Sequence, residues 1–175
     1  GKLKLKSEIA QKEADTAEKE YHHKVNEIGE KVKVTYYELF YIHKSIEITE
    51  KNKSLFKEFI KIAETKYSVG QGIQQDILKA QVELSKILNE QIKLEQEKET
   101  TEAMLNSLLS RNPQSPVGKP DEFEKTELKF TIEELMKMAE SHMPILLGIK
   151  DSVQKYEKSY FLAKKDYYPD FEVNL

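Results

Sequence analysis

The sequence has no cysteine, no tryptophan and, between Lys2 and Asn112, no proline. Without cysteine the chain can form no disulfide and can do no thiol chemistry. Without proline, nothing breaks a helix over that whole stretch. No apolar run approaches the ~20 residues of a membrane-spanning helix, and no signal peptide is recognisable. Because the chain starts abruptly in a lysine-rich helical pattern, we expect it to be a segment of a longer protein whose targeting signal lies elsewhere.

Charged residues make up 34% of the chain and hydrophobic residues 38%, with a formal net charge of -3. Globular chains usually carry about 25% charged residues. This composition is poor in core-forming residues and favours an elongated helical body over a sphere. Lysine and glutamate are interleaved rather than gathered in patches, so the sequence predicts no nucleic-acid partner.

Two heptad patterns run side by side along the first part of the chain. The first seam, which steps by three and four and is interrupted only at Lys53, consists of Val25, Ile28, Val32, Thr35, Leu39, Ile42, Ile46, Thr49, Lys53, Phe56, Ile60, Ala63 and Tyr67. The second seam consists of Val34, Tyr37, Tyr41, Ile48, Leu55, Phe59 and Ile62. A two-stranded coiled coil needs only one seam, so two seams predict a helix with neighbours on both sides. A helix half-buried in an ordinary bundle is the alternative.

Two of the three glycines between Lys2 and Asn112 are Gly70 and Gly72, in "KYSVGQGIQQDILKAQ". The apolar pattern restarts after them, and only the stretch 95–102, "EQEKETTE", has no apolar residue. That stretch indicates a solvated face or the polar wall of a water-filled space. Glycine tolerates positive φ, so these two residues predict the tip of an αα-hairpin with one of them at positive φ.

The fold class expected is all-α: a long antiparallel coiled-coil α-hairpin with additional shorter helices and the remnant of a barrel strand at the C-terminus. We expect a single domain with a first arm over 3–67, a tip over 68–75, a second arm over 76–111 and a loop over 112–130. Helices follow over 131–142, opened by a Thr131–Glu134 capping box, and over 144–167, opened by Pro144. The first arm overshoots the second by roughly 30 Å, which the last helix, about 35 Å long, can cover. Alternating residues over 170–175 predict the start of a strand, either of a barrel or of an ordinary sheet edge.

The sequence shows no catalytic constellation, no metal site and no cofactor site, so we expect no enzyme activity. His22 and His23 point to different sides of a helix, and His43 and His142 are isolated. Asp76 is the one polar residue that stands out. Its position predicts a first-turn carboxylate that the helix dipole favours.

The order of these motifs resembles the periplasmic part of the TolC-type outer membrane efflux protein family. The tip "KYSVGQGIQQDILKAQVEL" is similar to the family's spacing of basic-aromatic pair, glycine, aspartate, aliphatic residue and alanine. "AMLNSLLSR" resembles the end of the second arm, with Ser110 where glycine is common. The stretch from Ile132 to Leu175 resembles the link into a second repeat. At the tip the sequence departs from the family pattern at Gln71, Gly72 and Ile73.

The resemblance implies a homotrimer whose hairpins form a periplasmic helical tunnel below an outer-membrane barrel in a Gram-negative organism. The family exports drugs, metal ions or proteins delivered by an inner-membrane efflux transporter through a periplasmic adaptor protein. It further implies that adaptor docking involves Val69, Gly70, Gln71, Gly72 and Ile73, and that Asp76 belongs to the closing aperture. This chain would be one hairpin repeat without the barrel and the second hairpin, unable to conduct alone.

Two other functions compete with this one. The chain could be the helical hairpin of a periplasmic adaptor, which would require flanking β-rich halves. It could also be a structural coiled coil with no transport role. That reading explains the two seams but neither the glycine-to-aspartate spacing at the tip nor the alternating C-terminal residues.

Overall fold

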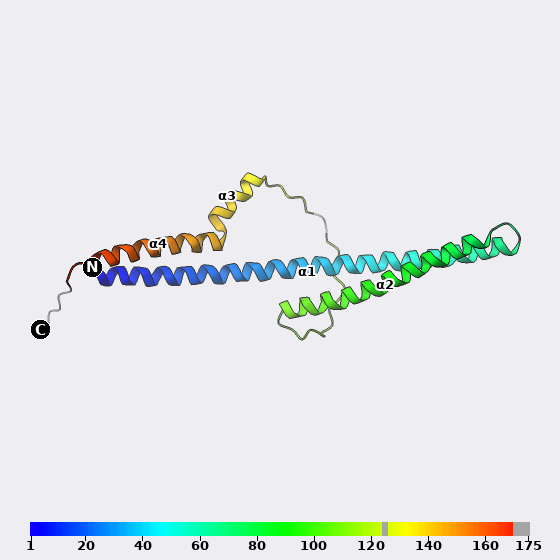
Figure 1. Ribbon diagram of the computed structural model, residues 1–175, viewed down its shortest axis with the longest axis horizontal. Coiled ribbons are helices and arrows are strands. Elements are labelled where there is room, and N and C mark those ends of the chain that lie inside the picture. Colours follow the sequence, from blue (N-terminus) through cyan, green and yellow to red (C-terminus); the bar gives the residue numbers. More distant parts are fainter. Residues whose placement is uncertain (124–125, 170–175) are drawn as a thin grey trace. The chain divides into compact units, whose positions relative to one another are not determined.

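The computed structural model describes residues 1–123 and 126–169, and every regular element in those residues is a helix (Figure 1). The four helices are α1 (Lys2–Ser68), α2 (Gln74–Leu108), α3 (Ile132–His142) and α4 (Pro144–Lys165). The expected all-α hairpin with additional shorter helices is therefore confirmed. The strand expected over 170–175 lies outside the described residues.

The chain forms two compact units, and α1 contributes to both. Unit 1 consists of residues 1–29 and the chain from 125 onward, and unit 2 consists of residues 30–124. The single-domain organisation expected from the sequence stays a prediction. None of the helices in the described part of the chain is long and apolar enough to cross a membrane.

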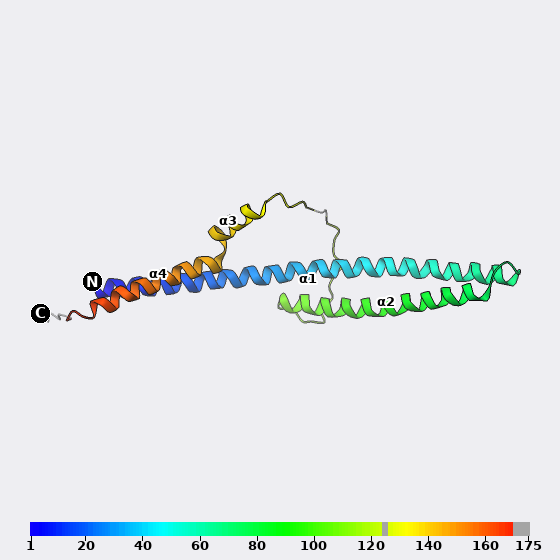
Figure 2. The same cartoon turned by 45° about the horizontal axis from the view of Figure 1, so that its top comes forward.

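Unit 2 is the hairpin, in which α2 runs antiparallel to the second half of α1 (Figures 1 and 2). Its core contains Leu39 and Ile42 from α1 and Leu94 and Leu105 from α2. Leu39 and Ile42 belong to the first seam, and its members from 46 to 63 are half-buried. The first seam from Val32 to Ala63 is therefore the face of α1 that packs in the hairpin, and its end members Val25, Ile28 and Tyr67 are exposed. The residues of the second seam remain exposed in this arrangement.

Lys53, the one charged residue in the first seam, is satisfied by a polar cluster between the two arms. Its Nζ lies 3.0 Å from Gln91 Oε1 on α2 and 2.6 Å from Glu50 Oε2 on α1. Gln91 Nε2 donates in turn to Glu50 Oε2 at 3.1 Å. A polar residue at a seam position favours the one alignment in which its partner lies opposite. This cluster therefore helps to set the register of the hairpin.

After α2 the chain returns to α1 and packs on it over residues 119–123, a segment that we call the strap. The Phe123 ring lies between the rings of Tyr37 and Phe40, with centroid distances of 4.8 Å and 4.5 Å. Pro120 is buried. The Asp121 amide donates to the Tyr36 hydroxyl at 3.2 Å. These contacts hold the strap against α1.

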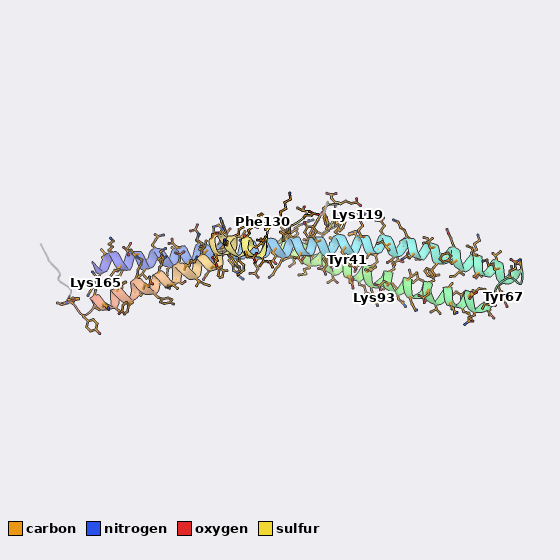
Figure 3. The ribbon with its side chains drawn as sticks, turned by 90° about the horizontal axis from the view of Figure 1, so that it is seen from above. Tyr41, Tyr67, Lys93, Lys119, Phe130 and Lys165 are labelled. Carbon is orange, nitrogen blue, oxygen red and sulfur yellow. The ribbon has the colours of Figure 1, made fainter. Side chains whose placement is uncertain are left out.

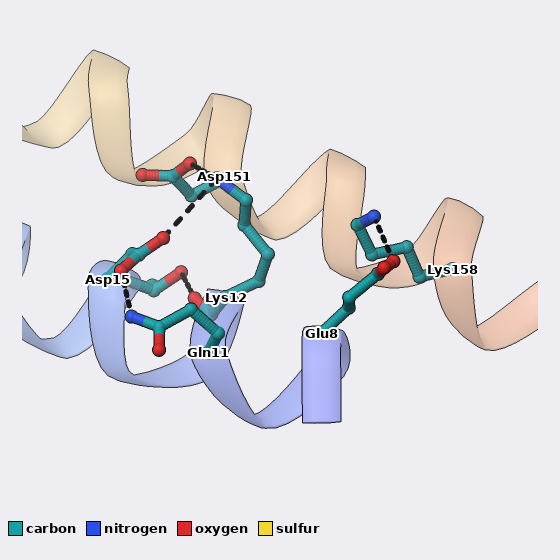
Figure 4. A network of polar contacts seen from close by, with 7 residues as sticks. Glu8, Gln11, Lys12, Asp15, Asp151 and Lys158 are labelled. Carbon is teal, nitrogen blue, oxygen red and sulfur yellow. Dashed lines mark hydrogen bonds and ion pairs between the residues drawn. The ribbon is translucent and has the colours of Figure 1, made fainter. Parts of the chain in front are cut away.

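Unit 1 joins the first turns of α1 to α4 through charged contacts (Figure 4). Glu8 pairs with Lys158 at 2.6 Å, and Lys12 pairs with Asp151 at 2.6 Å. The hydrogen bond from Lys158 lowers the pKa of Glu8, and the bond to Asp151 raises the pKa of Lys12. Gly148 is buried, and a Cβ there would lie 3.3 Å from Lys19 Cβ, so its lack of a side chain lets the two helices approach closely.

The short helices begin as their sequences predict. At α3 the Thr131 hydroxyl accepts from the Glu134 amide at 3.2 Å, and the Glu134 carboxylate accepts from the Thr131 amide at 2.9 Å. This is the expected capping box. Pro144 occupies the first turn of α4.

The second arm begins at Gln74 rather than at 76, and it ends at Leu108 rather than at 111. It begins earlier because the extended Ile73 is already the N-cap residue. It ends earlier because Ser110 adopts φ 55°, which a helix cannot continue through.

Candidate functional site

The turn of the hairpin is built by one glycine with a left-handed backbone. Gly70 has φ 72°. Its amide donates to the Tyr67 carbonyl at 3.0 Å, and the Gln71 amide donates to the Lys66 carbonyl at 2.8 Å. This pair of bonds is the Schellman motif, which ends a helix at a left-handed residue. The prediction that one of the two glycines has positive φ is confirmed, and the residue is Gly70.

Gly72 serves a different purpose, which is to provide space. A Cβ at this position would lie 3.2 Å from both Lys66 Cβ and the Tyr67 amide nitrogen. That is closer than ordinary van der Waals contact, so the last turn of α1 would have to shift. The two glycines therefore answer two requirements of one tight turn: Gly70 supplies the backbone angle and Gly72 the room. Figure 3 labels Tyr67 beside this turn.

Asp76 lies in the first turn of α2, three residues after the N-cap residue Ile73. Its amide donates to the Ile73 carbonyl at 3.1 Å, and its side chain is exposed. Ile73 has no side chain that could cap the helix. A carboxylate at this position is therefore favoured by the partial positive charge of the helix N-terminus.

A hollow of about 250 Å³ lies at the tip, between the two arms. Four residues singled out from the sequence line it together: Gln71, Gly72, Ile73 and Asp76. Val69 and Gly70 are exposed but are not among its lining residues.

The rest of the lining comes from the last turns of α1, namely Phe59, Ile62, Ala63 and Lys66. The sequence analysis did not assign these four residues to the tip site. Phe59 and Ile62 are the last two members of the second seam. Because this seam runs up to the turn, it could have indicated that these two residues belong to the tip site. The lining of the hollow thus combines apolar side chains from α1 with one basic residue, Lys66, and one acidic residue, Asp76.

The four histidines do not form a cluster with acidic residues. Across residues 1–123 and 126–169, no group of three or more histidine, aspartate or glutamate side chains could hold a metal ion. His43 is half-buried, and its Nε2 has no hydrogen-bond partner in the structure. Burial, and next the positive charge of Lys98, lower the pKa of His43, which favours its neutral imidazole.

The sequence profile of one protein family matches residues 1–111, which include the first arm, the tip and the second arm. That family is the outer membrane efflux proteins. The chain belongs to this family. Outer membrane efflux proteins are components of transport channels rather than enzymes. Searches among curated proteins and among solved structures find no match to the chain.

Family membership covers the tip and both helices that build it, so the site described above is part of the region shared with other outer membrane efflux proteins. The strap, α3 and α4 lie beyond the matched residues.

Proposed function

We propose that the hairpin is a segment of the periplasmic tunnel wall in a trimeric outer membrane efflux channel. The observation that carries this proposal is a column of exposed apolar residues on α1. Its members, each seven residues after the last, are Val34 (59% exposed), Tyr41 (68%), Ile48 (57%), Leu55 (49%) and Ile62 (52%). A strict seven-residue repeat matches a second helix that supercoils with α1.

The second arm also has apolar residues that the hairpin leaves exposed, at Leu78, Val82, Leu88 and Ile92. A hairpin that offers apolar side chains on each arm can have a helical neighbour on each side. Repetition of such contacts around a three-fold axis closes a ring. This supports a tunnel wall built of hairpins, as the family resemblance implies.

We further propose that the tip meets a periplasmic adaptor protein, which links the channel to an inner-membrane efflux transporter. Val69 and Ile73 are 62% and 57% exposed, which gives the turn an apolar surface that a partner can cover. The docking residues proposed are Val69, Gly70, Gln71, Gly72 and Ile73. Asp76, exposed beside them, is the proposed aperture residue.

The tunnel wall is tested by placing Leu55→Glu in the full-length protein, with Ser54→Glu as the matched control. Both changes add one negative charge at neighbouring positions of α1. Only Leu55 belongs to the apolar column, because Ser54 is exposed on the polar side of the helix. Leu55→Glu should abolish outer-membrane trimers, and Ser54→Glu should leave their level unchanged. Equal trimer levels in the two variants would contradict the proposal.

The tip is tested separately, by Gly70→Val and Asp76→Ala in the full-length protein. Gly70→Val should leave trimers in the membrane but reduce pump-dependent export, because a valine cannot adopt φ 72° without reshaping the docking surface. Asp76→Ala should leave stability almost unchanged and loosen the closed state, seen as greater uptake of large antibiotics. If both variants assemble, export and exclude like the parent protein, the tip is only a turn.

The family match favours this function over the two alternatives considered from the sequence. An adaptor hairpin or a purely structural coiled coil would also have a heptad seam. The exposed apolar column on α1 and the match to a channel family together support the channel.

A further inference from the structure

One end of unit 1 brings together two parts of the chain that are far apart in the sequence. The first turns of α1 lie beside the last turns of α4, as Figure 1 shows at the end marked N. Lys2 Nζ lies 3.3 Å from Asp166 Oδ1 and donates to the Tyr168 carbonyl at 3.2 Å. We call residues 1–8 and 157–169 the basic–aromatic end.

The basic–aromatic end is positively charged, although the whole chain has a net charge of -3. It contains six lysines and three acidic residues. Two of the acidic residues have lysine partners within this same end, Glu8 with Lys158 and Asp166 with Lys2. The exposed lysines are Lys4, Lys6, Lys164 and Lys165.

Aromatic side chains stand exposed among these lysines. Tyr160 is 58% exposed, Phe161 55%, Tyr167 90% and Tyr168 71%. Lys164 Nζ lies 4.6 Å from the centre of the Tyr160 ring. A hollow of about 550 Å³ is lined by Tyr160, Ala163, Lys164, Asp166 and Tyr167. Packing within unit 1 does not explain why these aromatic side chains are exposed beside Lys164 and Lys165.

We propose that the basic–aromatic end binds the surface of a phospholipid bilayer that contains anionic headgroups. Tyrosine rings favour the interface between water and hydrocarbon, since they are apolar with a polar tip. Lysines extend their amines toward headgroup phosphates while their stems cover apolar surface. The proposal rests on the proposed function, under which the bilayer is the outer membrane. The surface that is bound is then its periplasmic leaflet.

The identity of the lipid follows from the charge. Each basic residue near an anionic surface strengthens binding by roughly fivefold, and the attraction falls off within a Debye length. Zwitterionic phosphatidylcholine provides no net surface charge for the lysines. Anionic phosphatidylglycerol provides that charge, which the exposed amines of Lys4, Lys6, Lys164 and Lys165 can contact.

The test is sedimentation of the 175-residue chain with vesicles of phosphatidylcholine alone or mixed with phosphatidylglycerol. We expect binding to the mixed vesicles, weakened by salt, and little binding to pure phosphatidylcholine. Lys164→Gln combined with Lys165→Gln should weaken binding roughly 25-fold, because two such lysines are removed. Lys57→Gln combined with Lys61→Gln, two exposed lysines of unit 2, should leave binding unchanged.

A second pair, Lys4→Gln with Lys6→Gln, removes charge from the start of α1 without touching the end of α4, and the same loss is expected. Equal binding to both kinds of vesicle, absence of binding, or an equal loss in the unit 2 control would overturn the proposal. The vesicle assay requires no assembled channel, whereas the trimer level of Leu55→Glu tests the tunnel proposal. A negative result in one experiment is therefore distinguishable from a negative result in the other.

Discussion

Ser110 is the position at which a single substitution should stabilise the hairpin. Among the described residues it is the only non-glycine residue with positive φ, at 55°. It follows α2, where the Arg111 amide donates to the Asn106 carbonyl at 2.8 Å and the Ser110 amide donates to the Ser107 carbonyl at 3.0 Å. These are the two bonds of a Schellman motif, whose left-handed position is most often glycine. We therefore expect Ser110→Gly to relieve backbone strain.

The size of the effect follows from two opposing contributions. A residue with a Cβ in the left-handed region costs about 1–2 kcal/mol. Glycine loses more conformational entropy on folding than serine does, which reduces the gain in stability by about 0.5–1 kcal/mol. The net stabilisation should be about 0.5–1 kcal/mol. For a chain of this length that corresponds to a rise in Tm of about 1–4 °C.

Thermal unfolding followed by far-UV circular dichroism measures this change, and Ser85→Gly is the matched control. Ser85 lies inside α2, exposed, with its hydroxyl donating to the Gln81 carbonyl at 2.9 Å. The same substitution there should destabilise, by roughly 0.5 kcal/mol, because glycine is a poor helix former. If Ser110→Gly lowered Tm as Ser85→Gly does, the strain assigned to Ser110 would be wrong.

Three further outcomes follow from the structure. Gly72→Ala should lower the Tm of the chain by destabilising the turn about 1 kcal/mol, because its Cβ would lie 3.2 Å from Lys66 Cβ, whereas Gly118→Ala meets nothing within 4 Å and should be nearly neutral. Lys158 lowers the pKa of Glu8 in the folded chain, so the stabilisation from this pair is present at neutral pH and is lost as the pH falls through the folded pKa. Glu8→Gln should reduce the acid sensitivity of Tm. Zinc, magnesium and ATP should leave Tm unchanged, and a shift of several degrees at modest concentration would reveal a site.

The hairpin was predictable because its determinants are local in the sequence. Heptad spacing identifies the face of α1 that another helix covers, and Leu39 and Ile42 on that face are indeed buried. Gly70 could be identified as a turn residue because few other residues tolerate positive φ. The capping box at Thr131 and Glu134 needs only a serine or threonine followed three residues later by glutamate or glutamine. Each of these signals acts between residues that are close in the sequence.

The strap and the individual residue pairs between α4 and α1 could not be predicted, because their sequence signals have several physical meanings. The prolines after α2 indicate that no helix forms there, and they do not indicate that Phe123 will lie between Tyr37 and Phe40. The interleaved lysines and glutamates are equally compatible with pairs inside one helix and with pairs between helices. Nothing in the spacing of Glu8 indicates that its partner is Lys158, 150 residues later.

The two halves of α1 are therefore held by different forces. In unit 2, leucine and isoleucine side chains of the first seam are buried against α2, and each such burial is worth about 1.5–3 kcal/mol. In unit 1, α1 and α4 are joined by ion pairs with partly exposed partners, such as Glu8 with Lys158. Pairs of this kind typically contribute about 0–1 kcal/mol each. Apolar residues of unit 1 such as Leu5, Ile9 and Leu162 are only half-buried, whereas the buried hydrophobic residues of the described chain, Leu39, Ile42, Leu94 and Leu105, all lie in unit 2. Among the described residues, the hydrophobic stabilisation is thus concentrated in the hairpin that carries the family match.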